Sequence, residues 1–387
     1  MNESSESLPL LLHVFPTFVA AGAQMRTIAL MEAFGTRYRQ RVLALDGRFD
    51  ALDLLPDDLD VGAVGRLEPS GWRGASRAAR AQLAEMRPDL CMTYNWGSFD
   101  YVLAARSARI PHLHHEDGFN ADEASGQKLR RVLARRFGLG RARRVLVPSL
   151  VLEECALRTW RLPPDKVRRI PNGVRLERFY PDPEAAASIR KQLGIPEHAF
   201  VIGAVGHLRP VKNFGRLIRS VAAMTDVPSA AEIHLVILGD GQERAKLDQL
   251  AEQYPPQRGR VHLVGHQKDL RAWYAAMDVF CLSSDSEQFP VSLLEAMACQ
   301  RACVSTDVGD VRAVLPTSAG DGVVAIGEGR TEALIQREFA AALSRMLRAP
   351  ETRAELALAG HERCREVYSF EAMTAAHFEE IEAALHQ

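Results

Sequence analysis

Hydrophobic residues along the chain fall into short continuous runs, and these alternate with longer stretches in which hydrophobic residues recur every three or four positions. Short apolar runs bounded by turn-forming residues are typical of buried strands, and the longer period is typical of amphipathic helices. Alternation of the two predicts βα units built around parallel sheets.

In the first half of the chain, the runs predict strands at Leu10–Phe15, Arg41–Leu45, Asp89–Tyr94, His112–His115, Arg144–Val147 and Val167–Ile170. Helices fit between them, for example at Met25–Phe34 and Ser98–Ala108. Turn formers at Pro171–Gly173 and Pro181–Pro183 then end the series. We therefore expect a first domain over residues 1–178.

The same alternation restarts in the second half, with strands predicted at Phe200–Val205, His234–Leu238, Val261–Val264, Val279–Leu282 and Ala302–Ser305. Beyond Thr331 the pattern is helical, at Leu334–Leu347, Glu351–Tyr368 and Phe370–Leu385. A length of 387 residues suits two or three domains. The predicted fold class is therefore α/β, with a second doubly wound domain over residues 179–368 and a helical tail over residues 369–387.

Composition agrees with a globular chain, since 47% of residues are hydrophobic and 25% are charged. Lys and Arg (48) nearly cancel Asp and Glu (49), so the net charge of −1 gives no indication of a nucleic-acid partner. The six cysteines contain no CxxC spacing and predict reduced thiols, without a zinc site. Asp58-Leu59-Asp60 follows no continuous strand, so we interpret this Asp-x-Asp as an acidic loop and expect no metal site.

The N-terminal apolar stretch from Leu8 to Ala23 resembles the core of a signal peptide, but Glu3 and Glu6 precede it where positive charge is expected. No other run approaches the roughly 18 apolar residues that a membrane span needs. We expect a soluble, cytoplasmic protein.

Candidate binding residues cluster in the loops that follow the strands of the second domain. These loops are Gly206–Asn213, Gly239–Gly241, Gly265–His266 and Ser283–Pro290. Ligands of open parallel sheets bind beyond the carboxyl ends of the strands, so the four loops should share one rim. Their convergence predicts a ligand site.

The last of these loops leads into a predicted helix at Val291–Cys299, with Pro290 at its first position. Glu295 then lies among Leu294, Ala296 and Met297, where a carboxylate needs donors such as the hydroxyls of a ribose. The alternative is a surface Glu on an amphipathic helix, but Glu287 at the mouth of the same loop favours a site. The free N–H groups of the helix start would favour a diphosphate.

The spacing Glu287-x7-Glu295, with Phe289 and Pro290 inside it, resembles the retaining glycosyltransferases of family four, which have the GT-B fold. The resemblance covers nearly the whole chain, because five further motifs follow the family's order: the glycine loop near Gly22, Ile170–Val174, Gly206–Lys212, Leu238–Gly241 and Ser305–Gly309. It implies two Rossmann-like domains facing across a cleft. The C-terminal helix would pack back on the first domain.

The resemblance also implies roles for individual residues. Glu287 would contact sugar hydroxyls, Glu295 would hold the nucleotide ribose and Lys212 would bind the diphosphate. The donor site would further include Gly22, Gly206, Gly239, Gly265, His266, Gln288, Phe289, Pro290 and Val291. Base recognition would involve the backbone near Gly265 and His266.

The sequence departs from the family pattern at two places. Where the family usually has an Arg directly after the glycine of the phosphate loop, this chain has His207, and either His207 or the nearby Arg209 would supply the charge. Where the family commonly has a His near the sugar, the register places Asp117. Either His115 is displaced into that role, or Asp117 accepts a hydrogen bond from the sugar, or the segment is purely structural.

A basic segment runs from Lys128 to Arg144, with eight basic residues and no acidic ones. Leu129, Val132, Leu133 and Phe137 add an apolar stripe at helical spacing. Two interpretations stay open: a peripheral contact with the inner face of the cell membrane, or a packed helix with a solvated basic face.

The leading hypothesis is transfer of a sugar from a nucleotide diphosphate sugar of UDP or GDP type to a glycan or lipid-linked acceptor. The resemblance implies retention at the anomeric carbon and neither a metal nor a cofactor. A nucleotide-sugar epimerase or hydrolase of the same architecture, or a non-catalytic nucleotide-sugar-binding protein, is the alternative.

Overall fold

The computed structural model describes residues 8–20, 22–68, 74–119, 123, 126–224, 227–228, 231–253 and 260–386. Glu3 and Glu6, which flank the N-terminal apolar stretch, lie outside the described residues, as does Ala21 within it. The chain divides into two compact units: unit 1 is Met1–Pro171 with Met373–Gln387, and unit 2 is Asn172–Ala372. The divisions thus fall at 171/172 and 372/373, whereas the sequence placed them at 178/179 and 368/369.

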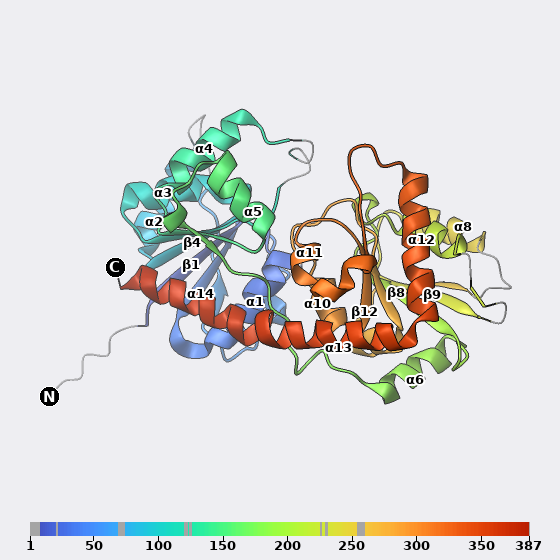
Figure 1. The fold of residues 1–387 in the computed structure, drawn as a ribbon. Coiled ribbons are helices and arrows are strands. Elements are labelled where there is room, and N and C mark those ends of the chain that lie inside the picture. Colours follow the sequence, from blue (N-terminus) through green and yellow to red (C-terminus); the bar gives the residue numbers. More distant parts are fainter. Residues whose placement is uncertain are drawn as a thin grey trace. The chain divides into compact units, whose positions relative to one another are not determined.

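Unit 1 contains a seven-stranded parallel sheet in the order β3-β2-β1-β4-β5-β6-β7 (Figure 1). Its strands are β1 (Leu10–Phe15), β2 (Arg39–Ala44), β3 (Val61–Ala63), β4 (Leu90–Tyr94), β5 (His112–His115), β6 (Arg144–Val147) and β7 (Val167–Arg169). The order of strands reverses between β1 and β4. The carboxyl ends of these two strands are therefore the switch point at which ligands of doubly wound sheets bind.

The helices of unit 1 are α1 (Gly22–Phe34), α2 (Gly74–Met86), α3 (Phe99–Ala108), α4 (Leu129–Leu139), α5 (Leu150–Glu154) and most of α14 (Phe370–Leu385). α14 joins this unit from the far end of the sequence and lies beside α1 (Figure 1). The Phe378 ring lies 6.2 Å from that of Phe34, and the Tyr38 hydroxyl donates to Glu382.

Unit 2 repeats the plan with a six-stranded parallel sheet in the order β10-β9-β8-β11-β12-β13. Its strands are β8 (Phe200–Val205), β9 (Ile233–Leu238), β10 (Val261–Leu263), β11 (Val279–Leu282), β12 (Ala302–Thr306) and β13 (Val323–Val324). The switch point of this sheet lies between β8 and β11.

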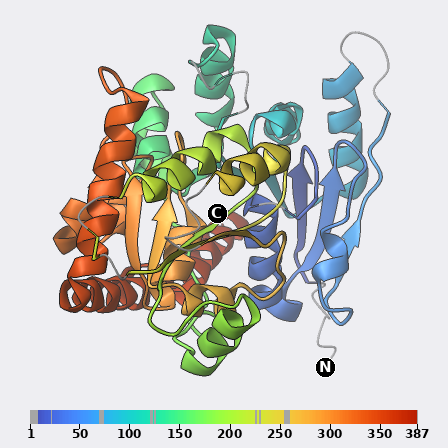
Figure 2. The same ribbon diagram turned by 90° about the vertical axis from the view of Figure 1, so that its right-hand side faces the viewer.

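The helices of unit 2 are α6 (Pro183–Gln192), α7 (Phe214–Ala222), α8 (Arg244–Glu252), α9 (Leu270–Ala276), α10 (Val291–Ala298), α11 (Val311–Val314), α12 (Glu332–Arg348) and α13 (Pro350–Val367). α12 and α13 pack against β12 (Figures 1 and 2). The core is apolar, and β9 is buried along its whole length.

These observations confirm the predicted class of two doubly wound parallel sheets followed by C-terminal helices. The predictions missed β3 and β13. Both are edge strands of two or three residues, and runs this short carry no periodic signal.

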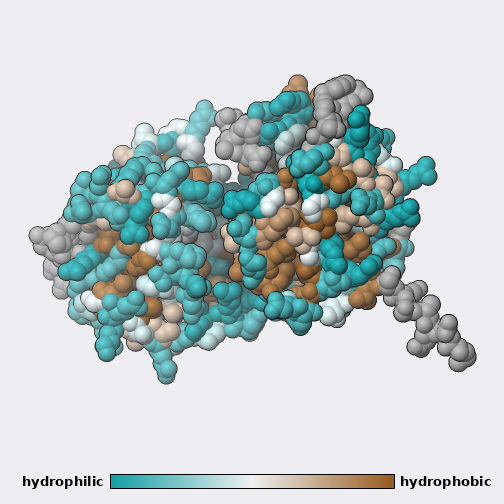
Figure 3. Space-filling view, turned by 180° about the vertical axis from the view of Figure 1, so that it is seen from behind, coloured by the Kyte–Doolittle hydropathy of each residue, from teal (hydrophilic) through white to brown (hydrophobic). Residues whose placement is uncertain are grey.

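On the outer surface, Figure 3 shows hydrophobic residues gathered on one face of unit 1, the unit that carries the N-terminus, whereas the face of unit 2 in this view is mostly hydrophilic. Within the described part of the chain, every helix is too short or too polar to cross a membrane.

Candidate functional site

The switch point of unit 2 brings together two predicted site residues from different loops. Lys212, in the loop after β8, places its Nζ 2.5 Å from Oε1 of Glu287, in the loop after β11. The Ser284 hydroxyl donates to the same oxygen over 2.6 Å. Side chains 75 positions apart in the sequence thus form one cation–carboxylate pair at the place where a doubly wound sheet binds its ligand.

Backbone contacts hold these two loops against each other. The amide of Asp285 donates to the carbonyl oxygen of Val211 over 2.8 Å, and the Ser283 hydroxyl donates to that of Lys212 over 2.9 Å. Because both bonds flank the Lys212–Glu287 pair, they limit the positions that the pair can adopt.

Close approach between loops requires glycine at two positions. Gly239 has φ of +129°, and a Cβ there would lie 2.0 Å from the carbonyl oxygen of Gly206. Gly309 has φ of +51°, and a Cβ there would lie 2.5 Å from the carbonyl oxygen of Glu287. Only glycine tolerates both the backbone conformation and the contact, so the loops after β8, β9, β11 and β12 pack as one rim.

Arg216 of α7 holds the loop after β11 in place through a hydrogen bond and ion pairs. Its guanidinium is buried and donates to the carbonyl oxygen of Ser283 over 3.0 Å. It also pairs with Asp285 over 2.7 Å and with Glu332 at the start of α12 over 2.6 Å. Hydrogen bonding to Arg216 lowers the pKa of Glu332, so the pair is ionised at neutral pH. Arg216 could not be singled out from the sequence, because its carboxylate partners lie far away along the chain.

Glu295, in the second turn of α10, accepts a hydrogen bond from the Tyr274 hydroxyl at Oε2 over 2.7 Å. Burial raises the pKa of Glu295 to about 7, although the bond from Tyr274 opposes the shift. The protein itself thus supplies, at one oxygen, the hydrogen-bond donor that this carboxylate was expected to need. Its other oxygen, Oε1, has no protein donor assigned among the described residues.

The other predicted donor residues lie around this rim. His207 and Arg209 are exposed on either side of buried Leu208, while Gly206 and Gly265 lie at the loop turns and His266 is exposed. Gln288 is half-buried, and its Oε1 lacks a partner within the described structure.

Phe289 does not line the surface of the rim, since it is buried in the core of unit 2 against Tyr368. The prediction for Pro290 was wrong by one position. Pro290 is the residue before the helix, and α10 begins at the exposed Val291. The φ of −80° suits the proline ring, but its ψ of 99° is extended and does not continue into the helix.

Unit 1 presents a second group of predicted residues at its own switch point. Asp117, just after β5, binds the guanidinium of Arg26 on α1 through both oxygens. Its backbone amide donates to Oδ1 of Asn95, after β4, over 2.7 Å. Arg26 and Asn95 were not predicted, because both contacts join segments that are distant in the sequence. Gly22 lies at the start of α1, where the structure leaves open space around it.

His115 lies deeper than Asp117 and is buried between two rings. Its imidazole stacks on Tyr94 at 4.6 Å and on His377 of α14 at 5.7 Å. Burial lowers the pKa of His115 well below its usual range, so the ring is neutral. Neither ring nitrogen has a hydrogen-bond partner in the described part of the chain.

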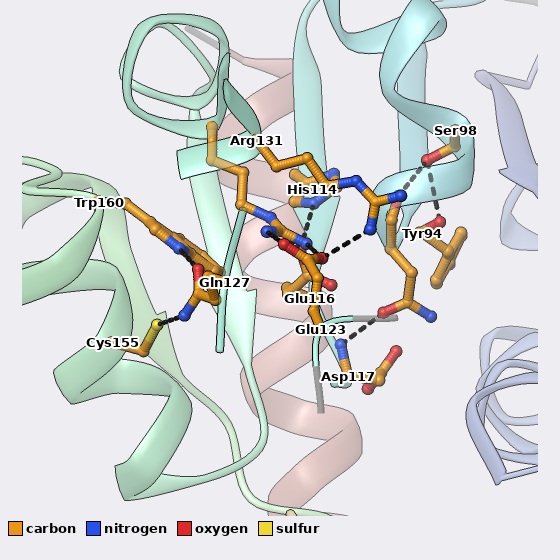
Figure 4. Close-up of polar contacts among 12 residues, drawn as sticks. Tyr94, Ser98, His114, Glu116, Asp117, Glu123, Gln127, Arg131, Cys155 and Trp160 are labelled. Atoms are coloured by element: carbon orange, nitrogen blue, oxygen red, sulfur yellow. Dashed lines mark hydrogen bonds and ion pairs between the residues drawn. The ribbon is translucent and has the colours of Figure 1, made fainter. Parts of the chain in front are cut away.

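A buried charge network lies beside these residues (Figure 4). Arg135 of α4 donates to Glu116 and to both oxygens of Glu123, each over 3.2 Å, and Arg131 donates to Glu123 over 3.0 Å. The Arg135 guanidinium also lies 5.1 Å from the ring centroids of Trp96 and Trp160. Burial opposes ionisation of Glu123, but hydrogen bonds from Arg135 and Arg131 lower its pKa.

This network shows that only part of the basic segment from Lys128 to Arg144 forms a solvated basic face. Arg135 is fully buried, and Arg131 is paired with Glu123. Lys128, Arg130, Arg136 and Arg141 do remain exposed. This pairing could not be predicted from the basic segment itself, because the carboxylates that pair with its arginines lie outside the segment. No group of side chains in the described residues forms a metal-binding cluster.

Comparison with known families agrees with this architecture. The family model for glycosyl transferases group 1 matches residues 199–349, and the model for the glycosyl transferase 4-like domain matches residues 14–173. The chain therefore belongs to the group 1 glycosyl transferases of family four.

Similar solved structures share the GT-B fold. HepE from Anabaena, in complex with UDP and glucose, superposes with a TM-score of 0.79 at 17% identity, over 97% of this chain and 100% of that one. WaaG, a glycosyltransferase involved in lipopolysaccharide biosynthesis, superposes with a TM-score of 0.68 at 17% identity, over 95% and 98% of the two chains.

Curated relatives are similar over part of their length. A D-inositol 3-phosphate glycosyltransferase from Saccharomonospora viridis is 31% identical over 64% of this chain and 58% of its own length. A UDP-Gal:alpha-D-GlcNAc-diphosphoundecaprenol alpha-1,3-galactosyltransferase from Escherichia coli is 28% identical over 53% and 54%. The match thus spans little more than half the length of these two relatives.

Proposed function

We propose that this chain transfers a sugar from a nucleotide diphosphate sugar to a glycan or lipid-linked acceptor, with retention at the anomeric carbon and without a metal ion. The observation that carries this proposal is the Lys212–Glu287 pair at the switch point of unit 2. It provides a cation for a phosphate and a carboxylate for sugar hydroxyls on one rim.

The diphosphate binds at Lys212. A diphosphate carries more negative charge than the Glu287 carboxylate, so it competes for the ammonium group and frees Glu287 to accept from the sugar. Arg209 adds a second cation, because its guanidinium is exposed beside the loop. The exposed His207 is the alternative source of this charge.

The ribose binds at Glu295. Tyr274 already donates to Oε2 and leaves Oε1 available for a ribose hydroxyl. Since the pKa of Glu295 is about 7, the carboxylate needed for this contact is only partly ionised at neutral pH before the nucleotide binds.

The chemical step follows from the charge that develops on the leaving diphosphate. As the bond between the anomeric carbon and the phosphate oxygen breaks, Lys212 and Arg209 stabilise the new negative charge. The acceptor oxygen bonds to the anomeric carbon on the same face, and its proton passes to the departing phosphate oxygen. In unit 1, Asp117 is the candidate acceptor of a sugar hydrogen bond.

UDP is the favoured nucleotide. Its support is that HepE binds UDP and glucose and that the Escherichia coli relative is named for UDP-galactose. The same relative's name includes a diphosphoundecaprenol-linked acceptor, which favours a lipid-linked acceptor over a soluble glycan.

A lipid-linked acceptor requires access to a membrane surface, and α4 supplies a suitable face. Leu129, Leu133 and Phe137 recur every fourth residue and are 73%, 42% and 63% exposed. The exposed cations Lys128, Arg130 and Arg136 flank them. Apolar side chains beside cations are typical of helices that lie in an anionic membrane interface. We propose that this face makes a peripheral contact with the membrane.

Incubation of the protein with UDP-, GDP- and ADP-sugars and a polyprenyl diphosphate glycan tests the proposed reaction. We expect acceptor-dependent product from the UDP-sugar, an unchanged anomeric configuration in the NMR spectrum of the product, and full activity with a chelator. Conversion of the donor alone, without an acceptor requirement, would contradict transfer.

Co-sedimentation with phosphatidylglycerol vesicles tests the membrane contact. Arg130→Ser with Arg136→Ser should reduce binding, whereas Arg77→Ser with Arg80→Ser, an equal charge change on exposed residues of α2, should not. Equal binding of both double variants would refute the contact.

A further inference from the structure

A second basic feature of unit 1 lies at the rim formed by the amino ends of its strands, opposite the rim that contains the switch point. A cavity of about 490 Å³ opens there, beside the amino ends of β5 and β6 and the carboxyl ends of α3 and α4. Its lining contains five cationic residues, Arg106, Arg109, Arg141, Arg143 and Lys166, together with His112. We call this cavity the basic pocket. Among the described residues that line it, none is acidic.

The cations of the basic pocket have no carboxylate partner among the described residues. None of the five forms an ion pair within the part of the chain that the structure describes. This differs from other arginines of unit 1, several of which are paired with carboxylates: Arg26, Arg41, Arg131, Arg135, Arg144 and Arg169. The pocket therefore collects positive charge that the protein does not balance nearby.

The negative ends of nearby helix dipoles offset only a small part of this positive charge. α3 ends at Ala108 and α4 ends at Leu139, so two helix carboxyl ends face this edge of the sheet. Each end carries about −0.5 of an elementary charge. Together they offset about one of the five positive charges, which leaves an excess of about four.

A concave surface with uncompensated cations concentrates anions, and arginine forks match phosphate oxygens in particular. We infer that the basic pocket is a binding site for a phosphate-bearing anion, separate from the proposed donor site. The anion is supplied either as a free phosphate compound or as the phosphate of a lipid headgroup. The inference does not depend on the proposed transferase activity, since the pocket uses neither Lys212 nor the loops of unit 2.

Calorimetric titration with pyrophosphate tests the free-anion source. Every protein in this series carries Lys212→Ala, which removes the main cation of the donor site. We expect saturable binding by this protein, at least tenfold weaker binding after Arg106→Ser with Arg143→Ser, and unchanged binding after Arg77→Ser with Arg80→Ser. The last pair is the matched control for net charge. Arg141→Ser with Lys166→Ser repeats the test if the first pair fails to fold.

Co-sedimentation with phosphatidylglycerol and phosphatidylcholine vesicles tests the lipid source, using the same pairs without Lys212→Ala. Loss of binding to the anionic vesicles in the pocket variants, with retention in the control pair, assigns the pocket to a headgroup phosphate. The inference is overturned if neither pyrophosphate nor vesicle binding differs between the pocket variants and the control pair.

Discussion

Each unit contains a buried arginine that joins two carboxylates, but the two arginines differ in what they hold. Arg135 of unit 1 lies in an aromatic cage, and Glu116 and Glu123 beside it are fully buried. Arg216 of unit 2 is equally buried, yet the side chains of Asp285 and Glu332 are 45% and 43% exposed. The charges of unit 1 are thus enclosed in its core, whereas Arg216 of unit 2 anchors the loop that belongs to the proposed donor site.

Replacing Arg135 should have the largest effect on stability. Arg135→Met leaves Glu116 as a buried carboxylate without its guanidinium, and removal of one partner from a buried pair costs about 3–5 kcal/mol. Urea unfolding followed by tryptophan fluorescence and by far-ultraviolet circular dichroism measures this loss. Arg136→Met, an exposed neighbour on the same helix, should change stability by less than about 0.5 kcal/mol. Similar losses in the two variants would mean that the network does not stabilise unit 1.

Lys212→Ala should reduce turnover by roughly 10²–10³-fold, because one preorganised donor to the developing diphosphate charge is lost. Steady-state rates with the UDP-sugar measure the effect. Lys246→Ala, on the exposed surface of α8, is the control and should retain full turnover. A Lys212→Ala rate within threefold of the wild type would show that the diphosphate binds elsewhere.

Acid should unfold unit 1 before unit 2. Burial lowers the pKa of His13 and His377 to about 4 and that of His112 to about 3, whereas unit 2 has one such residue, the half-buried His262, in the described chain. In the unfolded chain these histidines bind protons below about pH 6.5, whereas in the folded chain they stay neutral until about pH 4. The stability present above pH 6.5 is therefore lost as the pH falls towards 4. Protonation of His13 and of His377 in the unfolded chain each lowers the free energy of unfolding by about 3 kcal/mol at pH 4.

Hydrogen exchange at pH 7, 5 and 4 resolves the two units. The protection factors of amides in β1, β4 and β5, which account for the slower intrinsic exchange at lower pH, should fall first, and His377→Gln should reduce that sensitivity. Earlier exposure of β8 and β9 would contradict the assignment of acid sensitivity to the buried histidines of unit 1.

Arg216→Met should destabilise unit 2 by about 1.5–3 kcal/mol, the range for hydrogen bonds to charged groups. The loss is smaller than for Arg135 because water can solvate the freed carboxylates. The variant should also raise the KM for the donor, since the loop after β11 loses its anchor. Arg219→Met, exposed on the same helix, should change neither quantity. A normal KM in Arg216→Met would remove the positioning role.

The strands and the ligand loops could be predicted from the sequence because each depends on neighbouring residues. β1, β5, β6, β8 and β11 have the predicted boundaries, and Lys212 and Glu287 lie in loops that directly follow strands. The partners of the key side chains could not be predicted in this way. Arg26 meets Asp117 across 91 positions and Arg216 meets Glu332 across 116. Such pairs follow from the order of strands in the sheet, which local periodicity does not specify.

The smallest expected effect concerns Glu295. Its pKa of about 7 means that the carboxylate is protonated in most free molecules at pH 6 and ionised in most at pH 8. UDP affinity should therefore fall up to about tenfold from pH 8 to pH 6. Calorimetry of wild type and Glu295→Gln isolates this contribution, because titration of UDP itself affects both. Identical pH dependence in the two proteins would argue against a ribose contact at Glu295.

Hydrogen exchange with and without UDP tests most directly whether the rim of unit 2 holds the nucleotide. Saturating UDP should slow exchange in residues 206–213 and 283–298, the segments that carry Lys212, Glu287 and Glu295. Lys212→Ala should abolish this protection at the same UDP concentration. Protection that appears only in unit 1, or that survives Lys212→Ala unchanged, would contradict the proposed donor site.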